Sequence, residues 1–372
     1  MEQIRPGTKL HALLSWVQDA GASDLHLQED KPARYRVDGQ LKILDPKELS
    51  PFSKEQIHRL LAENFSLASS SRIELDREVD LSIQMGETRW RANFSKQQGC
   101  QSCSFRIVPK HKFRLKDLRL PETLKDVLKI PRGLVLLTGP TGQGKSTTVR
   151  ALIQEINATQ AVRIITIEDP IEYLFEDELS QFEQREVGID TASFADGIRN
   201  AMRQDPNVIF VGEIRDRASI FSAVQAAETG HLVFTTLHAD SAGQAIGRIR
   251  EYYPAGEQHG ISVMLARNLN MIACQRLIPD VSGQRVPCVE ILKRDHTIQR
   301  AIEENELNRL TEIIEQCTNQ GMHSFDQYLI ELMLRGIVSE DTAKNYAVNS
   351  HRLEMLLAGY QSSQGILLPE RR

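Results

Sequence analysis

The chain has 372 residues, of which 41% are hydrophobic and 26% are charged, and its formal net charge is −5. This length exceeds that of a typical single domain and suits two domains that each bury a core. The small acidic surplus gives no electrostatic reason to expect nucleic acid as the main partner, because such binding depends on an excess of Lys and Arg. No stretch approaches the ~18 consecutive apolar residues of a membrane span, and the N-terminal stretch lacks the apolar core of a secretory signal. We therefore expect a cytoplasmic protein whose contact with a membrane is peripheral.

The cysteines are odd in number and scattered, which is typical of a reducing compartment. They are Cys100, Cys103, Cys274, Cys288 and Cys317. The motif "CQSC" at 100–103 could be half of a zinc site, but no second CxxC or His pair completes four ligands. A redox motif would open a helix, whereas this one follows a strand-like stretch. We interpret it as a turn with two incidental thiols.

Residues 1–109 predict a small α+β domain with a mostly antiparallel sheet. A helix pattern ends near Gly21 and a strand pattern begins at Asp24. The stretch "ARYRVDGQLKIL" alternates with period two around Asp38-Gly39, which indicates a hairpin. Further strands are expected at "VDLSIQ", "TRWRANFS" and "CSFRIVP". The basic stretch 110–122 is interpreted as a linker between domains.

From residue 133 the pattern changes to alternating strands and helices. The run "GLVLLTG" is short and continuously apolar, as a buried parallel strand should be. Three more such runs, "VRIITIE", "NVIFVGE" and "LVFTTLH", alternate with helical patterns, which predicts an α/β domain with helices on both faces of a parallel sheet. After about residue 255 the signals are mostly helical. We assign residues 123–350 to this domain and 351–372 to a flexible tail.

The stretch "GPTGQGKST" predicts a phosphate-binding loop between the first of these strands and its helix. Its glycines allow backbone amides to close around the β- and γ-phosphates, and the helix N-terminus adds partial positive charge. Lys145 should reach those phosphates, and the hydroxyl of Ser146 should ligate Mg²⁺. The residues expected to bind the nucleotide are Gly139, Pro140, Thr141, Gly142, Gln143, Gly144, Lys145, Ser146 and Thr147.

Two acidic residues end neighbouring strand patterns downstream of this loop. Glu168 closes "ITIE" and Glu213 follows "VIFVG". Ligands of an open parallel sheet lie at the carboxyl ends of its strands, so both acids should face the nucleotide. Glu168 is expected near Mg²⁺, directly or through water. Gly212 occupies the usual place of an acid, which favours an ATPase with Glu213 as the water-activating base over a GTPase-type switch.

Two histidines flank the strand "LVFTTL". His231 and His238 are seven residues apart, so a straight strand separates them by about 23 Å, on opposite faces. They cannot share a metal ion in that geometry. His238, at the carboxyl end, is expected to sense the γ-phosphate or the attacking water.

With "GPTGQGKST", "TIEDPIEY", "QREVGID", "VGEIRD" and "ETGHLVFTTLHADSA" in that order, the chain resembles the type II/IV secretion ATPases. Within that superfamily it is most similar to the PilT-type retraction ATPases of type IV pili. "GASDLHL" and "RVDGQL" match the family's PAS-like N-terminal domain, and 321–347 match its C-terminal helical segment. The resemblance implies a RecA-like ATPase domain, a homohexameric ring, and a site that the N-terminal domain closes. It also implies four boxes, which are Walker A (139–147), an Asp box (168–173), Walker B (208–213) and a His box (231–238).

A ring would place arginines over the phosphates of the site. We expect these from Arg91 and Arg106 in the N-terminal domain and from Arg203 and Arg215 beside Walker B. Assembly ATPases of the family carry a larger N-terminal extension and paired CxxC ligands in the C-terminal domain, and this chain has neither. The prediction is thus an ATP- and Mg²⁺-dependent motor for pilus retraction. Its partners would be an inner-membrane platform protein and a paralogous retraction ATPase. The alternatives are an ATPase of type IV secretion, conjugation or type II secretion (the DotB-like group), a pilus assembly ATPase, and a P-loop kinase.

Overall fold

The chain divides into two compact units, and each is described by itself. Unit 1 comprises Met1–His111 with Glu172–Leu174, and unit 2 comprises Lys112–Ile171 with Phe175–Arg372. The computed structural model describes residues 2–37, 39–45, 49–66, 69–71, 73, 78–108 and 114–360.

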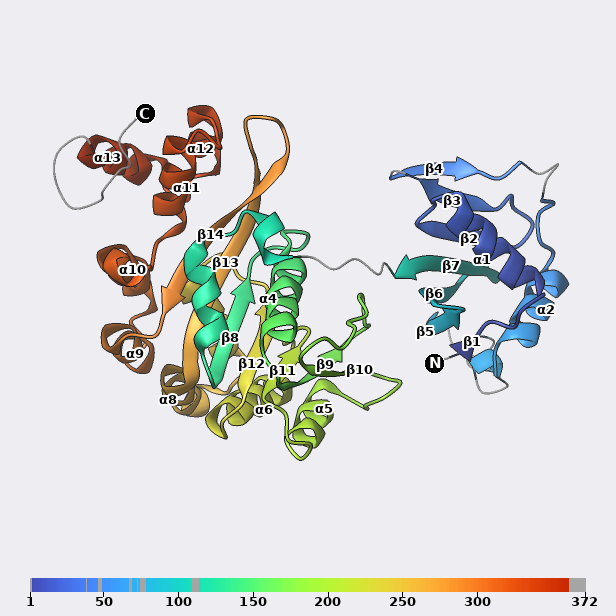
Figure 1. Ribbon diagram of the computed structural model, residues 1–372, viewed down its shortest axis with the longest axis horizontal. Helices are drawn as coiled ribbons and strands as arrows, with labels where there is room; N and C mark the ends of the chain where they lie inside the picture. Colours follow the sequence, from blue (N-terminus) through green and yellow to red (C-terminus); the bar gives the residue numbers. More distant parts are fainter. Residues whose placement is uncertain are drawn as a thin grey trace. The chain divides into compact units, whose positions relative to one another are not determined.

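Unit 1 is an α+β fold with an apolar core between its helices and one face of its sheet (Figure 1). The described strands run in the order β1-β5-β6-β7-β2-β3-β4. They are β1 (Glu2–Gln3), β2 (Asp24–Gln28), β3 (Arg34–Val37), β4 (Gln40–Ile43), β5 (Glu78–Met85), β6 (Thr88–Gln97) and β7 (Cys100–Val108). The helices are α1 (Lys9–Asp19) and α2 (Lys54–Asn64). All pairs except β1–β5 are antiparallel, as the sequence predicts.

The motif "CQSC" differs from its prediction, because it opens strand β7 and is not itself a turn. The turn lies at Gln98 and Gly99, both of which have positive φ. Cys103 then faces the core and is fully buried, and burial raises the pKa of its thiol to about 12. That thiol is therefore protonated at neutral pH and is a poor metal ligand or nucleophile.

Unit 2 is built on a sheet whose described strands run in the order β10-β9-β11-β12-β8-β13-β14. The strands are β8 (Gly133–Thr138), β9 (Arg163–Glu168), β10 (Gln181–Glu186), β11 (Val208–Val211), β12 (Leu232–Leu237), β13 (Leu269–Pro279) and β14 (Arg285–Lys293). All neighbours pair in parallel except β13 with β14. The parallel strands therefore share one edge at which their carboxyl ends meet.

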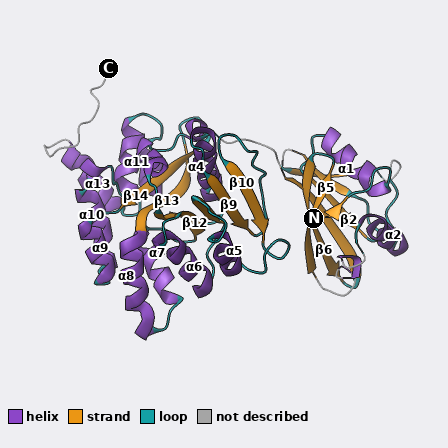
Figure 2. Cartoon of the chain, turned by 60° about the horizontal axis from the view of Figure 1, so that its bottom comes forward, coloured by secondary structure: helices purple, strands orange, loops and turns teal. Residues whose placement is uncertain are grey.

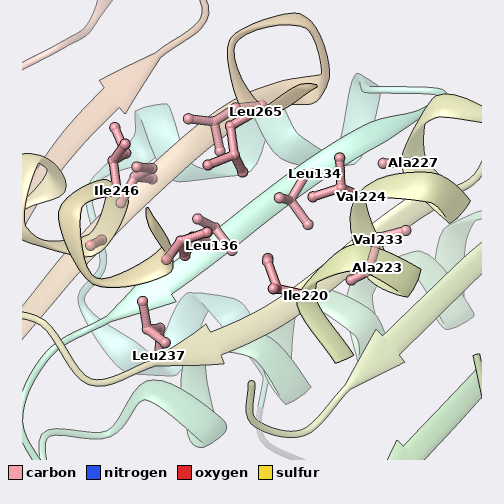
Figure 3. Packing of buried hydrophobic residues seen from close by; sticks show 14 of the residues in the cluster. Leu134, Leu136, Ile220, Ala223, Val224, Ala227, Val233, Leu237, Ile246 and Leu265 are labelled. Atoms are coloured by element: carbon pink, nitrogen blue, oxygen red, sulfur yellow. The ribbon is translucent and has the colours of Figure 1, made fainter. Parts of the chain in front are cut away.

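Helices cover both faces of this sheet (Figure 2). They are α4 (Lys145–Thr159), α5 (Phe194–Ala201), α6 (Arg217–Glu228), α7 (Ala242–Glu251), α8 (Gln258–Asn268), α9 (His296–Glu303), α10 (Leu310–Gln316), α11 (Phe325–Leu334), α12 (Glu340–Tyr346) and α13 (Ser350–Tyr360). Alternate residues of β8 enter two different cores, because successive side chains of a strand point to opposite faces. Leu134 and Leu136 pack with α6, α7 and α8 (Figure 3), whereas Val135 and Leu137 pack with α4. Both faces of β8 are therefore buried, and the loop that follows it is held on a rigid base.

Three boundaries differ from the sequence predictions. The region after residue 255 contains strands β13 and β14, because an antiparallel pair extends the sheet beyond β8. Residues 114–122 of the expected linker pack on unit 2, where Leu115 is buried against α4, and 110–113 lie outside the described residues. Residues 351–360 of the expected tail are helical as α13, and Leu353 is buried against α11, while 361–372 lie outside the described residues.

Candidate functional site

The nine residues 139–147 form the loop after β8 and the first turn of α4. Gly144 caps α4 in a left-handed conformation (φ 79°), and among the described residues no capping side chain accepts a hydrogen bond there. The N–H groups of a first helical turn have no partner within the helix. Together with the helix dipole they offer a site for an anion. The loop thus fits a phosphate group.

Gln275 of β13 supports this loop from beneath, and the sequence analysis missed it. Its Nε2 donates to the carbonyl of Gln143 at 2.7 Å, and its Oε1 accepts from the hydroxyl of Thr148 at 2.7 Å. A Cβ on Gly139 would lie 2.2 Å from the Gln275 carbonyl oxygen, so only glycine fits there. The residue lies more than 120 positions beyond the loop (132 from Gln143), so no local pattern marks it. Gln275 thus contacts the phosphate-binding loop at two places, Gly139 and Gln143.

Lys145 is 7% exposed and its ammonium points back into the loop. Its Nζ donates to the carbonyls of Gly139 at 2.8 Å and Pro140 at 2.9 Å, and it lies 3.3 Å from Nδ1 of His238. Burial lowers the pKa of Lys145, and the carboxylate of Glu213 opposes that shift. The Lys145 side chain thus lies where a phosphate would enter.

His238 connects Lys145 to Glu213. A protonated lysine can only donate, so Nδ1 of His238 accepts and Nε2 carries the proton. Nε2 lies 3.0 Å from Oε1 of Glu213 and donates to it. The tautomer follows from these two neighbours. A guanidinium nitrogen of Arg215 donates to the other carboxylate oxygen of Glu213 at 3.0 Å, and this hydrogen bond and the Glu213 charge raise the pKa of Arg215.

Glu168 is the last residue of β9, which lies next to β11 in the sheet, and it is 2% exposed. Its carboxylate accepts from the Thr166 hydroxyl at 2.8 Å and from Gln184 at 3.2 Å, and it lies 3.5 Å from a guanidinium nitrogen of Arg150. Arg150 stands one helical turn after Ser146 on α4, so Glu168 lies beside the helix face that carries Ser146. The amide of Gly212 donates to the Ile167 carbonyl at 2.8 Å, which joins the ends of β9 and β11. The two acids therefore lie at one edge of the sheet, as predicted.

Two other residues lie at the opposite edge. Arg203 is exposed in the turn between α5 and β11, ahead of the first residue of that strand. His231 precedes β12, and its Nδ1 lies 2.8 Å from the Ala226 carbonyl at the end of α6. Neither residue can reach the loop of its own chain, because the loop lies at the carboxyl ends of the strands.

The two arginines of unit 1 are cross-strand partners on β6 and β7. Arg91 lies 3.4 Å from Asp80, and Arg106 donates to Asp24 at 2.6 Å. The Arg91 side chain is 41% exposed and the Arg106 side chain is 67% exposed. Each arginine is therefore paired with a carboxylate of unit 1.

The loop residues fit a nucleoside triphosphate with Mg²⁺. Among the described residues, no group of three or more His, Cys, Asp or Glu could hold a metal ion alone. Mg²⁺ commonly takes one or two protein oxygens and completes its shell with phosphate and water. Ser146 at the start of α4 and Glu168 beside it supply oxygens of this kind. The fold and this edge of the sheet define a RecA-like P-loop nucleoside triphosphatase.

Comparison with known proteins gives the family. The model of the type II/IV secretion system protein family matches residues 7–355. The chain belongs to that family, which confirms the prediction from the motifs. It is 38% identical over 336 residues to the type IV pilus retractation ATPase PilT of Pseudomonas aeruginosa, covering 90% of this chain and 97% of that protein. It is 33% identical over 347 residues to the type IV pilus ATPase PilU of the same organism, covering 93% and 90%.

Solved structures agree with the fold. A crystal structure of the pilus retraction motor PilT with bound ADP has a TM-score of 0.83 at 37% identity, covering 94% of this chain and 99% of that one. The ATPase DotB of Legionella pneumophila has a TM-score of 0.78 at 25% identity, covering 96% and 99%. The predicted RecA-like ATPase domain with a smaller N-terminal domain is thereby confirmed.

Proposed function

We propose that the protein is a homohexameric, Mg²⁺-dependent ATPase motor that powers type IV pilus retraction. The chain is an ATPase by family and fold. The observation that carries the proposal is the contact of His238 with both Lys145 and Glu213. It connects the residue that binds phosphate, Lys145, to the proposed general base, Glu213. The retraction function rests on the names of the relatives, with PilT at 38% identity over nearly its whole length.

The geometry suggests how ATP changes the site. Lys145 has three N–H donors, and its three neighbours are two loop carbonyls and His238. An incoming γ-phosphate must displace at least one of them. If Nδ1 of His238 loses its donor, the imidazole is free to turn toward the phosphate or the attacking water. Binding of the γ-phosphate would thus change the hydrogen bonding of Glu213, because His238 contacts both Lys145 and Glu213.

The remaining residues take roles that follow from their positions. Glu213 orients and deprotonates the attacking water, and Arg215 holds the second carboxylate oxygen. Bound Mg²⁺ would neutralise charge on the β- and γ-phosphates, held by Ser146 with Glu168 nearby. Arg203 can act on a nucleotide only in a neighbouring subunit, because it lies away from its own loop.

Arg91 and Arg106 would have to exchange Asp80 and Asp24 for phosphate oxygens to act on a nucleotide, and such an exchange would couple hydrolysis to motion of unit 1. Among the described residues, no helix is long and apolar enough to cross a bilayer. We place the motor on the cytoplasmic side of the inner membrane, where it acts on a platform protein. The PilU relative suggests a paralogous retraction ATPase as a further partner.

Deletion of the gene, complemented with wild type or Lys145→Ala, tests the proposal. Hyperpiliated cells that do not twitch, rescued only by wild type, would support retraction. Bald cells would indicate pilus assembly. Normally piliated cells that have lost export or DNA transfer would indicate secretion, the alternative that the DotB likeness favours. Retraction in the Lys145→Ala strain would exclude a motor role, and ATP hydrolysis without any acceptor excludes a kinase.

A further inference from the structure

A buried carboxylate lies behind the loop that carries His238. Glu290 of β14 is 4% exposed and faces the start of helix α7. The amide of Ala242, the first residue of α7, donates to its Oε1 at 2.8 Å. The amide of Phe325, the first residue of α11, also donates to this carboxylate. Two helix N-termini thus converge on one acid. Burial raises the pKa of Glu290, and the hydrogen bonds from the two helix amides oppose that shift.

The same carboxylate is connected to the strand beneath the phosphate loop. Cys274 of β13 lies opposite Glu290 in the strand ladder, and its thiol donates to the carboxylate. The thiol sulfur in turn accepts from the hydroxyl of Thr138 at 2.8 Å. Thr138 is the last residue of β8, immediately before Gly139. A continuous hydrogen-bonded path therefore leads from the phosphate loop to the beginning of α7.

Arg276, two residues after Cys274 on β13, also contacts the loop after His238. Its guanidinium lies 3.9 Å from the Asp240 carboxylate, in the loop after His238, and 4.7 Å from the centre of the Phe325 ring. A cavity of about 730 Å³, lined by Pro140, His238 and Asp240 among others, opens beside this loop. Among the described residues, the loop has no packing on that side, so its position depends on its polar contacts. Arg276 also donates to the Asp240 carbonyl, and the exposed Arg248 donates to the His238 carbonyl at 2.8 Å.

We propose that Glu290 is a positioning residue for ATP hydrolysis, which holds the His238 loop through the N-terminus of α7. This role rests on the proposed ATPase function. Glu290 touches neither nucleotide nor water and acts by fixing where His238 meets Glu213. Glutamine keeps one acceptor oxygen and replaces the other with an NH₂ group that only donates, so it offers fewer acceptor sites to the two helix amides and the Cys274 thiol. Losing one buried hydrogen bond of this kind should lower kcat about tenfold.

The test compares four single variants and one double variant by kcat, KM for ATP and Kd for ADP. Glu290→Gln should lower kcat about tenfold while KM for ATP and Kd for ADP stay within about twofold, because the phosphate loop is unchanged. Ala242→Pro should do the same, since proline fits the first helical position but removes the donor N–H. Cys288→Ala, two residues away on β14 and in contact with α11, is the matched control and should keep wild-type kcat. In a His238→Ala background, Glu290→Gln should lower kcat further by less than about twofold.

Hydrogen exchange provides a readout that does not depend on activity. The Ala242 amide should exchange at least tenfold faster in Glu290→Gln than in wild type, with Cys288→Ala unchanged. The role is overturned if Glu290→Gln and Ala242→Pro keep wild-type kcat. It is equally overturned if Glu290→Gln lowers kcat by the same factor with and without His238. A wild-type chain that leaves ATP intact would instead contradict the proposed function.

Discussion

Replacing Gly139 by alanine tests the contact that shapes the phosphate loop. Gly139 has φ +142°, and a Cβ there would lie 2.2 Å from the Gln275 carbonyl oxygen, where real Cβ atoms keep at least 3.0 Å. One backbone must therefore move by at least 0.8 Å, the difference between those two distances. The neighbouring pair Thr138 and Cys274 is fixed in the β8–β13 ladder, so neither strand can yield freely.

Gly142→Ala is the matched control. Gly142 also has positive φ, at +77°, but a Cβ there meets no atom within 4 Å. It therefore loses only the backbone preference, ~1–2 kcal/mol. Gly139→Ala adds overpacking of ~1–3 kcal/mol to a comparable backbone term. We expect Gly139→Ala to be less stable than Gly142→Ala by about 2 kcal/mol, or about 4–8 °C in the melting temperature of unit 2.

The two units can be followed separately during thermal unfolding. Both tryptophans, Trp16 and Trp90, lie in unit 1, so their fluorescence reports that unit alone. Circular dichroism at the helical wavelength follows mainly unit 2, which contains most of the described helices. The fluorescence transition should not move in either variant. Equal melting of Gly139→Ala and Gly142→Ala would refute the close approach of Gln275 to the loop.

Three further changes test other parts of the structure. His238→Ala should reduce kcat about tenfold or more in steady-state assays with ADP affinity within about twofold, since it removes a partner of Glu213 and ADP lacks the γ-phosphate that His238 is expected to meet; a tenfold loss of ADP affinity would instead make His238 a ligand of the α- or β-phosphate. Burial lowers the pKa of His323 from 6.5 to about 4, so the unfolded chain binds the proton first and stability falls as pH drops. His323→Phe should remove about 2 kcal/mol of that loss between pH 6.5 and pH 5, measured by urea unfolding, and an unchanged pH slope would contradict it. Cys103→Ser should destabilise unit 1 by ~1–3 kcal/mol and Cys100→Ser should not, whereas equal loss, or melting lowered by a chelator, would point to a metal role.

The motifs predicted the parts of the fold that local chemistry determines. The strands β8, β9, β11 and β12 are short apolar runs closed by Gly, Glu or His, and the structure has each of them. Strand β13 was missed because it follows helix α8 without a turn signal, and β14 was missed because it contains Pro287. Proline is tolerated there because β14 is the edge strand of the sheet.

The site was predictable only where its residues lie within a motif. Lys145, Glu213 and His238 each lie beyond the carboxyl end of a strand of the parallel sheet. Because such ends meet at one edge of the sheet, the sequence predicts that the three side chains lie close together. Gln275 and Glu290 act across more than forty positions of sequence, and nothing in their own neighbourhoods distinguishes them from core polar residues. Long-range support of a loop is a property of packing, which a single sequence does not show.

Steady-state hydrolysis by Glu213→Gln, with ATP binding measured on the same preparation, tests the central claim most directly. Glutamine keeps the size of the side chain and one acceptor for His238 but cannot take a proton. The variant should bind ATP with a Kd within about twofold of wild type and turn over about 10²–10⁴-fold more slowly. Wild-type turnover in Glu213→Gln would contradict the proposal that this acid, tied to Lys145 through His238, activates the water.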